Sequence, residues 1–125
     1  MSIPTDLMYT HDHTWMQHPD RGICAVGVTH HIMQEVVGDV VYVELPKVGS
    51  KVKAGDQVGS VEGVKSISDV YAPVSGEVVK ANPELDEMPE LLNDEPYDAW
   101  LFMIRPADGG ANELLSAAQY KKLLG

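Results

Sequence analysis

Two stretches of the chain carry the same pattern, and together they decide the expected fold. The first reads Val43-Glu44-Leu45-Pro46-Lys47-Val48-Gly49-Ser50-Lys51-Val52-Lys53-Ala54-Gly55. The second, displaced by 27 residues, reads Val70-Tyr71-Ala72-Pro73-Val74-Ser75-Gly76-Glu77-Val78-Val79-Lys80-Ala81-Asn82. A valine, a proline, a glycine and the tripeptide Val-Lys-Ala recur in one register, which is too much agreement to arise by chance. Two copies are too few for a solenoid and favour a β-sandwich of two similar halves, each covering the apolar face of the other.

Short runs rich in β-branched residues extend this pattern on both sides of the repeat. The runs alternate with Gly, Pro, Asn and Asp, the residues that end strands and form turns. Strands are expected at residues 23–28, 40–45, 57–61, 67–72, 76–81 and 100–104. The expected fold is therefore mainly β: a flattened β-sandwich or barrel-like hybrid of two pseudo-symmetric halves, in a single domain that spans residues 1–125.

Two further segments are expected to be helical. Thr29 is positioned to cap a short helix over residues 30–37, which Gly38 would end. Asn112 is positioned to cap a C-terminal helix over residues 113–124, whose acidic start and basic end suit the helix dipole. The acidic, proline-containing residues 83–96 are typical of a long loop with room for one helical turn.

The charge of the chain argues against several classes of partner. Its formal net charge is -10 at pH 7 and its isoelectric point is near 4.7, so its surface repels phosphate backbones and anionic lipid. We therefore expect no nucleic-acid or membrane partner, and a monomer that docks onto basic patches of other proteins. The longest apolar run is too short to span a bilayer, and the N-terminus resembles neither a signal peptide nor an Arg-rich transit peptide. A cytoplasmic location is the simplest expectation.

Lys65 lies between the two copies of the repeat, in the run Glu62-Gly63-Val64-Lys65-Ser66. A tight hairpin joining the strands on either side would hold this lysine at a tip in solvent. An amine on a four-carbon stem can be acylated, and a long group attached there sweeps a large volume, as lipoamide and biotin carriers require. Most hairpin lysines are plain surface charges, so position alone does not establish attachment. Whether Lys65 is an attachment site therefore has to be judged from the residues around it.

The stretch around the lysine reads Val61-Glu62-Gly63-Val64-Lys65-Ser66-Ile67-Ser68-Asp69-Val70-Tyr71-Ala72-Pro73-Val74-Ser75-Gly76. This stretch resembles the glycine cleavage system H-protein family, whose modified lysine carries lipoate. Residues 9–15, 38–46 and 89–97 and the C-terminal helix resemble the family as well, so the resemblance covers essentially the whole chain. A biotin carrier would have a methionine on each side of the lysine, and a lipoyl domain of a 2-oxoacid dehydrogenase would have Asp-Lys-Ala at the tip.

The resemblance implies that Lys65 carries lipoic acid in amide linkage, attached by a lipoyl ligase or transferase. The chain would then be a lipoyl/biotinyl-type carrier in glycine catabolism and not an enzyme itself. Glycine decarboxylase would load an aminomethyl group, an aminomethyltransferase would remove it, and dihydrolipoyl dehydrogenase would reoxidise the dithiol that remains. Glu62 and Asp69 would help partners to recognise the tip. His31 and Thr14 would line a cleft that shelters the loaded arm from water.

Four features depart from the pattern of that family. Gly63 replaces the usual Ser or Thr two residues before the lysine, which is expected to loosen the hairpin. Thr14 replaces a glutamate that lines the cleft. The helix after Thr29 is one residue longer before Gly38, and the turn before Trp100 is one residue shorter. These departures keep a second function open, that of a divergent H-like paralogue acting in lipoate relay or as a non-catalytic lipoylated redox or regulatory module.

The other chemistry-bearing residues indicate no second site. The chain has five histidines, His11, His13, His18, His30 and His31. They lack the cysteine pair or clustered acid that would complete a metal site. Cys24 lies in an apolar run, cannot form an internal disulfide, and is expected to be an inert core thiol. Because no nucleophile motif or glycine-rich phosphate loop occurs, we expect neither a catalytic residue nor a metal ion.

Overall fold

The computed structural model describes residues 3–111 and 113–125. Its strands are β1 (Leu7–Tyr9), β2 (Thr14–Gln17), β3 (Cys24–Val28), β4 (Val40–Glu44), β5 (Lys51–Val52), β6 (Gln57–Gly63), β7 (Ile67–Tyr71), β8 (Val74–Ala81) and β9 (Phe102–Ala111). Its helices are η1 (Ile32–Val37), α1 (Glu84–Glu87), α2 (Leu91–Asp94) and α3 (Ala117–Leu124). The expected strands are confirmed with shifted ends, whereas the sequence analysis missed the short strands β1, β2 and β5. The loop expected at residues 83–96 contains α1 and α2.

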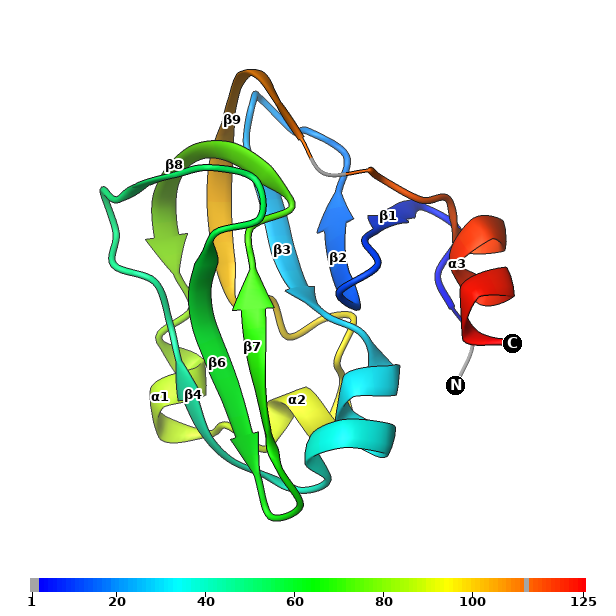
Figure 1. The fold of residues 1–125 in the computed structure, drawn as a ribbon. Coiled ribbons are helices and arrows are strands. Elements are labelled where there is room, and N and C mark those ends of the chain that lie inside the picture. The colour runs from blue at the N-terminus through cyan, green and yellow to red at the C-terminus, as the bar shows by residue number, and fades with distance from the viewer. Residues whose placement is uncertain (1–2, 112) are drawn as a thin grey trace.

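The strands form two layers, shown in Figure 1. Within the described residues, one antiparallel sheet has six strands in the order β1-β2-β3-β9-β8-β5, and the other has three in the order β4-β6-β7. The sheets enclose an apolar core between them without closing into a barrel. The expected mainly-β sandwich is confirmed.

The two copies of the repeat pair with each other through β5 and β8. Lys51 lies opposite Glu77 in the register, and the Val78 amide donates to the carbonyl of Ser50 at 2.9 Å. These two pairs are equivalent in the repeat: Val78 lies 27 residues after Lys51, and Ser50 lies 27 residues before Glu77. A local two-fold relation therefore connects the copies. The strands in which the two copies begin, β4 and β7, flank β6 on its two sides in the three-stranded sheet.

Valine and isoleucine side chains from both sheets fill the core. Val43, Val61 and Val70 of the three-stranded sheet belong to one cluster with Val78 and Ile104 of the six-stranded sheet. Each of the five is at most 3% exposed. Full burial of such a side chain is worth about 1.5–3 kcal/mol before the entropy of ordering it is subtracted. This cluster fixes β6 and β7, and with them the position of the hairpin that joins the two strands.

The short helix expected over residues 30–37 is confirmed, and most of it is a π-helix. Gly38 ends it with φ +72°, and the Gly38 amide donates to the carbonyl of Met33, five residues back, at 2.8 Å. A π-turn holds more residues than an α-turn, which accommodates the additional residue before Gly38. The prediction that Thr29 caps this helix is wrong. The hydroxyl of Thr29 hydrogen-bonds with the Tyr120 hydroxyl at 2.7 Å, and within the described residues no side chain caps the start of η1.

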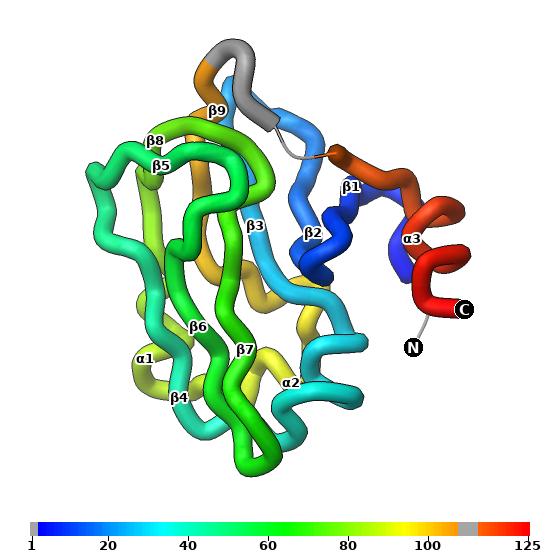
Figure 2. Tube along the Cα trace, viewed as in Figure 1, coloured from blue at the N-terminus to red at the C-terminus, as the bar shows by residue number. Residues whose placement is uncertain are grey.

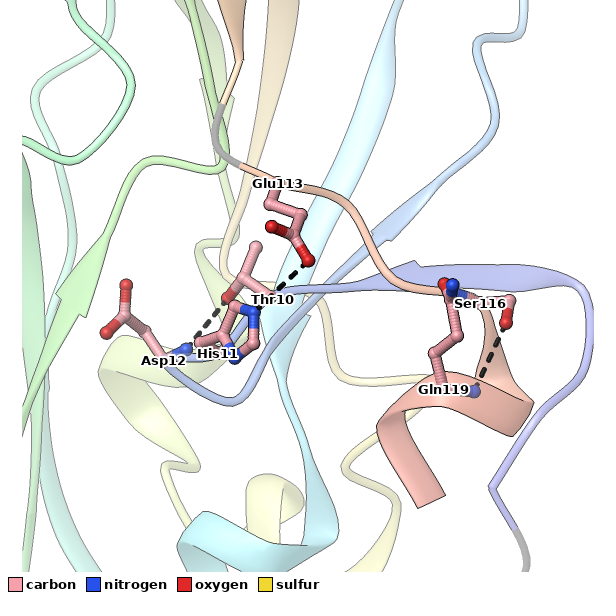
Figure 3. A network of polar contacts seen from close by, with 6 residues as sticks. All are labelled: Thr10, His11, Asp12, Glu113, Ser116 and Gln119. Atoms are coloured by element: carbon pink, nitrogen blue, oxygen red, sulfur yellow. Dashed lines mark hydrogen bonds and ion pairs between the residues drawn. The ribbon is translucent and has the colours of Figure 1, made fainter. Parts of the chain in front are cut away.

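The C-terminal helix begins later than expected. Ser116 caps α3, because its Oγ accepts from the Gln119 amide at 3.2 Å while Gln119 Oε1 accepts from the Ser116 amide at 2.9 Å (Figure 3). Leu115, just before this cap, forms an isolated β-bridge with Tyr9, which holds the preceding segment against β1. The predicted start at residue 113 is therefore wrong, and the predicted cap, Asn112, lies outside the described residues.

A second apolar cluster joins the two ends of the chain. It includes Tyr9, Trp15, Leu115 and Tyr120, and the rings of Tyr9 and Tyr120 stack with centroids 4.8 Å apart. The exposed His11 adds a contact of 3.5 Å from its Nε2 to the Glu113 carboxylate (Figure 3). Figure 2 shows the result, with α3 lying beside β1. Within the described residues, no helix is long and apolar enough to cross a membrane.

Candidate functional site

Lys65 occupies the tip of the hairpin between β6 and β7, as the sequence predicts. Glu62 lies opposite Ile67 as the last pair of the two strands, and the Gly63 amide donates to the carbonyl of Ser66 at 2.9 Å to close the turn. Lys65 is exposed, and Val64 beside it is 68% exposed. Figure 2 shows this hairpin projecting at one end of the molecule. The side chain of Lys65 is therefore accessible to a macromolecular partner.

The backbone of the tip is held by the end of η1, although the tip itself faces solvent. The Lys65 amide donates to the carbonyl of Val37 at 3.0 Å, and the Val64 amide donates to the carbonyl of Asp39 at 2.9 Å. The Nζ of Lys65 donates to the carbonyl of Gln34 at 3.3 Å. A lysine with a fixed backbone and an exposed amine can be presented in one orientation without burying its reactive atom.

Asn93 of α2 supports the helix end from the other side. Its Nδ2 donates to the carbonyl of Gly38 at 2.9 Å, and its Oδ1 accepts from the Val40 amide at 2.8 Å. The side chain therefore bridges the turn between η1 and β4. Sequence analysis did not single out Asn93, because its partners are backbone groups far away in the chain that leave no motif of their own.

Gly63 is needed for a close approach, a role that the sequence analysis missed when it expected only a looser hairpin. A Cβ at this position would lie 2.0 Å from the carbonyl oxygen of Val37. That oxygen is the one that accepts from the Lys65 amide. The absence of a side chain at position 63 thus lets the end of η1 reach the tip of the hairpin. A glycine at this position is visible in the sequence, but its role can be recognised only once the position of the end of η1 is known.

Glu62 and Asp69, the expected recognition residues, lie on the exposed face of the three-stranded sheet. Cross-strand partners point to the same face, so Tyr42, Glu62 and Ile67 form one row across the sheet. Tyr42 is 56% and Ile67 55% exposed. Asp69 lies on the same face and accepts from the Gln57 Nε2 at 2.9 Å. Acidic and apolar groups thus lie together on the sheet that ends in Lys65.

The structure brings His31 against His13. Their rings stack with centroids 4.4 Å apart, and His13 Nδ1 lies 2.7 Å from the Tyr120 hydroxyl. Burial, followed by the neighbouring His31, lowers the pKa of His13, and burial raises the pKa of Tyr120 to about 12. Thr14 follows His13 in β2 and is 1% exposed, so its side chain lies beneath the surface.

Two surface pockets are lined by other residues. One of about 370 Å³ is lined by residues of β8 and of the segment around α2, among them Lys80 and Trp100. Another of about 380 Å³ is lined by residues of β5, β8 and β9, among them Lys51 and Arg105. Lys65, His31 and Thr14 line neither pocket. The expected cleft for the arm therefore coincides with neither of these pockets.

The other candidates for chemistry have structural roles. Cys24 is 0% exposed in the core, and burial raises the pKa of its thiol, which keeps it protonated and unreactive. Among the described residues, no three or more His, Cys, Asp or Glu side chains gather in a way that could hold a metal ion. Within the described residues, neither the thiol of Cys24 nor a metal-binding cluster offers a second candidate site.

A two-layer β fold that presents a lysine at a hairpin tip is compatible with a carrier protein, and the similarity to known proteins decides the family. The glycine cleavage H-protein family matches residues 7–125. Glycine cleavage system H proteins of Paraburkholderia phymatum and Nitrosospira multiformis are 48% and 50% identical to the chain. These alignments cover 100% and 99% of this chain and 99% and 96% of the relatives. The chain belongs to the glycine cleavage H-protein family, a family of lipoyl carriers.

A solved structure supports the same assignment at the level of the fold. The crystal structure of a glycine cleavage system H protein from Mycobacterium marinum superposes with a TM-score of 0.91 at 39% sequence identity. The superposition covers 98% of this chain and 99% of that one. The resemblance inferred from the residues around Lys65 is thereby confirmed.

Proposed function

We propose that the chain is a lipoyl carrier of glycine cleavage, with lipoic acid in amide linkage to the Nζ of Lys65, and that it acts as one domain spanning residues 1–125. The observation that carries the proposal is the exposed Lys65 at a closed hairpin tip, in a chain of the H-protein family. An arm attached there reaches outward from a fixed point. Partner active sites can then be served without any rearrangement of the sandwich.

The surroundings of Lys65 fit an acylated lysine. Its Nζ donates at 3.3 Å to the carbonyl of Gln34, and a secondary amide at this position still has an N–H for that acceptor. The stem lies across Gly38, where a Cβ would meet the Lys65 Cδ at 2.8 Å. When bound, the lipoyl group supplies a disulfide that accepts an aminomethyl group together with two electrons.

The chain itself positions the arm and leaves the chemistry to its partners. In this proposal glycine decarboxylase loads the arm, an aminomethyltransferase unloads it, and dihydrolipoyl dehydrogenase reoxidises it. A lipoyl ligase or transferase attaches lipoate to Lys65. Tethering keeps the effective concentration of the cargo high at each of these active sites, which is the advantage of a carrier over a free cofactor.

Partner recognition is proposed for the exposed face of the three-stranded sheet. Glu62 and Asp69 provide negative charge near the tip, and Tyr42 and Ile67 provide an apolar centre. Partners with a basic rim around an apolar patch would complement this face. The net charge of -10 would steer such partners to the chain before contact, so their association should slow as salt is added.

Shelter of the loaded arm is proposed for the side of the molecule that carries His31. That ring is partly exposed and stacks on His13, which is held in turn by Tyr120. Thr14 is buried, so in this proposal it supports the strand behind His13 and does not contact the arm directly.

A second candidate function is a divergent H-like paralogue that acts in lipoate relay or as a lipoylated redox or regulatory module. The observation that favours it is the buried Thr14, which offers no carboxylate to an aminomethyl cargo. Such a module would be lipoylated at Lys65 but would not turn over glycine.

An exchange assay separates the two candidates. The lipoylated protein is mixed with glycine decarboxylase and labelled bicarbonate, and label entering the carboxyl group of glycine is measured. The glycine-cleavage carrier should support exchange that Lys65→Arg abolishes. A protein that carries lipoate but supports no exchange, under conditions in which a known H protein does, would contradict glycine cleavage and favour the second candidate.

A further inference from the structure

The tip that presents Lys65 does not hold its shape alone. Two successive amides of the tip, those of Val64 and Lys65, donate to the carbonyls of Asp39 and Val37 at 2.9 and 3.0 Å. Both acceptors belong to the segment in which η1 ends and β4 has not yet begun. The conformation of the exposed tip is therefore set by a helix end from a distant part of the chain.

The π-register of η1 determines where the Val37 carbonyl lies. The Gly38 amide reaches back five residues to Met33 at 2.8 Å, so the last turn of the helix is wider than an α-turn. An α-helical turn over the same span would hold one residue fewer and would place a different carbonyl at the tip. The hydrogen bond between Val37 and Lys65 thus depends on the additional residue of the π-turn.

On the hairpin, Gly63 provides the space that the Val37 carbonyl occupies. A Cβ at position 63 would lie 2.0 Å from the oxygen and 2.6 Å from the carbonyl carbon of Val37. These are fixed backbone atoms, so a side chain could be admitted only by displacing the helix end. The displacement would break the hydrogen bond from the Lys65 amide to the same oxygen. The π-turn and Gly63 are therefore compatible with each other, and changing either one disturbs the tip.

The end of η1 also contacts the side chain of Lys65. Gly38, with φ +72°, leaves room for the stem of Lys65, and the Gln34 carbonyl accepts from Nζ at 3.3 Å. Backbone amide, stem and amine of one lysine thus all lie against η1. This is the arrangement expected of an element that positions an acceptor group, and the proximity of a π-turn to a candidate site agrees with where such turns often occur.

We propose that the π-turn of η1 and Gly63 form one positioning unit that fixes the hairpin tip in the conformation in which a lipoyl-attaching enzyme engages Lys65. The inference rests on the proposed lipoylation and assigns it a determinant beyond the lysine and its immediate neighbours. The unit acts on the backbone of Lys65 through the Val37 carbonyl, and the Gln34 carbonyl of the same helix also accepts from Nζ.

The test uses three variants of the full chain and a lipoyl ligase with lipoate and ATP. Gly63→Ser places a side chain against the Val37 carbonyl. Deletion of the exposed Glu35 shortens η1 by one residue and leaves Gly63 unobstructed. The third variant combines the two changes, and Ser66→Ala in the same turn serves as the control, because the carbonyl and not the side chain of Ser66 closes the tip.

Steady-state kinetics and amide exchange are measured for each protein. Gly63→Ser and the Glu35 deletion should each lower kcat/KM for lipoylation by about tenfold, mainly through a higher KM, with faster exchange of the Lys65 amide. Tenfold corresponds to about 1.4 kcal/mol, the size expected for one lost hydrogen bond. The combined variant should lose no more than the Glu35 deletion alone, because the shortened helix has already withdrawn the carbonyl against which the serine side chain would clash. Ser66→Ala should match the parent.

The outcomes separate the inference from the function on which it rests. If either single variant keeps the parental kcat/KM and slow exchange of the Lys65 amide, the positioning unit is overturned. If Gly63→Ser fails to fold, the Glu35 deletion decides alone, since it introduces no clash. A combined variant whose loss equals the product of the two single losses would also contradict the unit, since the two changes would then act independently. A parent that is never lipoylated would overturn the proposed function instead, and the role in acylation with it.

Discussion

Asn93 and Gly38 are joined by a hydrogen bond of 2.9 Å, from the side-chain amide of the first to the carbonyl of the second. The same side chain accepts from the Val40 amide at 2.8 Å. Through these two contacts α2 holds the segment on which the tip of the Lys65 hairpin rests. The acceptor lysine is thus supported by two layers of backbone contacts, first from η1 and then from α2.

Asn93→Ala should destabilise the fold and loosen the tip. The substitution removes both contacts to the turn after η1 and leaves a partly buried carbonyl and amide without this partner, a loss of about 1–3 kcal/mol. Urea unfolding at neutral pH measures the change. Asp94→Ala on the same short helix is the control, because Asp94 is exposed and should change stability by less than about 0.5 kcal/mol. Equal effects of the two substitutions would mean that the Asn93 bridge contributes nothing specific.

Tyr120→Phe should cost about 1–3 kcal/mol of unfolding free energy. The hydroxyl lies 2.7 Å from both Thr29 Oγ1 and His13 Nδ1, and Thr29 is 0% exposed, so the substitution leaves a buried hydroxyl without this partner. The ring and its stacking on Tyr9 are retained. Thermal unfolding of Tyr120→Phe is compared with that of Tyr42→Phe, because Tyr42 is 56% exposed. A melting temperature equal to that of the Tyr42 variant would argue against this hydrogen-bond network.

The stability of the protein should fall as pH drops below about 6.5. Burial and His31 lower the pKa of His13 in the folded state from its ordinary 6.5, whereas the nearby Asp12 opposes the shift and His11 adds to it. The unfolded chain therefore binds more protons near this pH, so stability is complete above the unfolded pKa and is lost below it. Denaturant unfolding at pH 7.5, 6.5 and 5.5 should show a steeper loss for the parent than for His13→Gln. Parallel losses in the two proteins would contradict this assignment.

Ser116→Ala should weaken α3 by about 1 kcal/mol, the usual value of an N-cap. The substitution removes the acceptor for the Gln119 amide and breaks the reciprocal cap shown in Figure 3. Ser116→Asp is the matched control, since aspartate caps helices about as well as serine. Chemical unfolding of both variants measures the difference. A loss of the same size in Ser116→Asp would show that the cap is not what stabilises this end of the chain.

The features that sequence predicts here are those that local residues specify. The repeat places Lys65 in the connection between its two copies, and the strands expected on both sides of that lysine place it at a hairpin tip. The β-branched residues of the strands with five or more residues predict those strands correctly, apart from shifted ends. β1 and β5 are too short for alternation to show, and they are strands because neighbouring strands pair with them.

The features that sequence misses depend on distant partners. Threonine is a common helix cap, but the hydroxyl of Thr29 hydrogen-bonds with Tyr120, 91 residues away in the chain. The extra residue before Gly38 is visible in the sequence, whereas its accommodation as a π-turn depends on packing against the hairpin. Gly63 looks like a source of flexibility until the Val37 carbonyl is seen against it. In each case a tertiary contact overrides the local preference.

Peptide-level mass spectrometry tests the central claim most directly. The protein is produced with lipoate and a lipoyl ligase, digested, and every lysine-containing peptide is examined, with Lys65→Arg and Lys53→Arg prepared in parallel. The lipoyl mass should appear on the peptide that contains Lys65, disappear in Lys65→Arg and persist in Lys53→Arg, whose lysine is exposed but lies outside the hairpin. An unmodified Lys65, or a lipoyl group on another lysine when Lys65 is intact, would contradict the account.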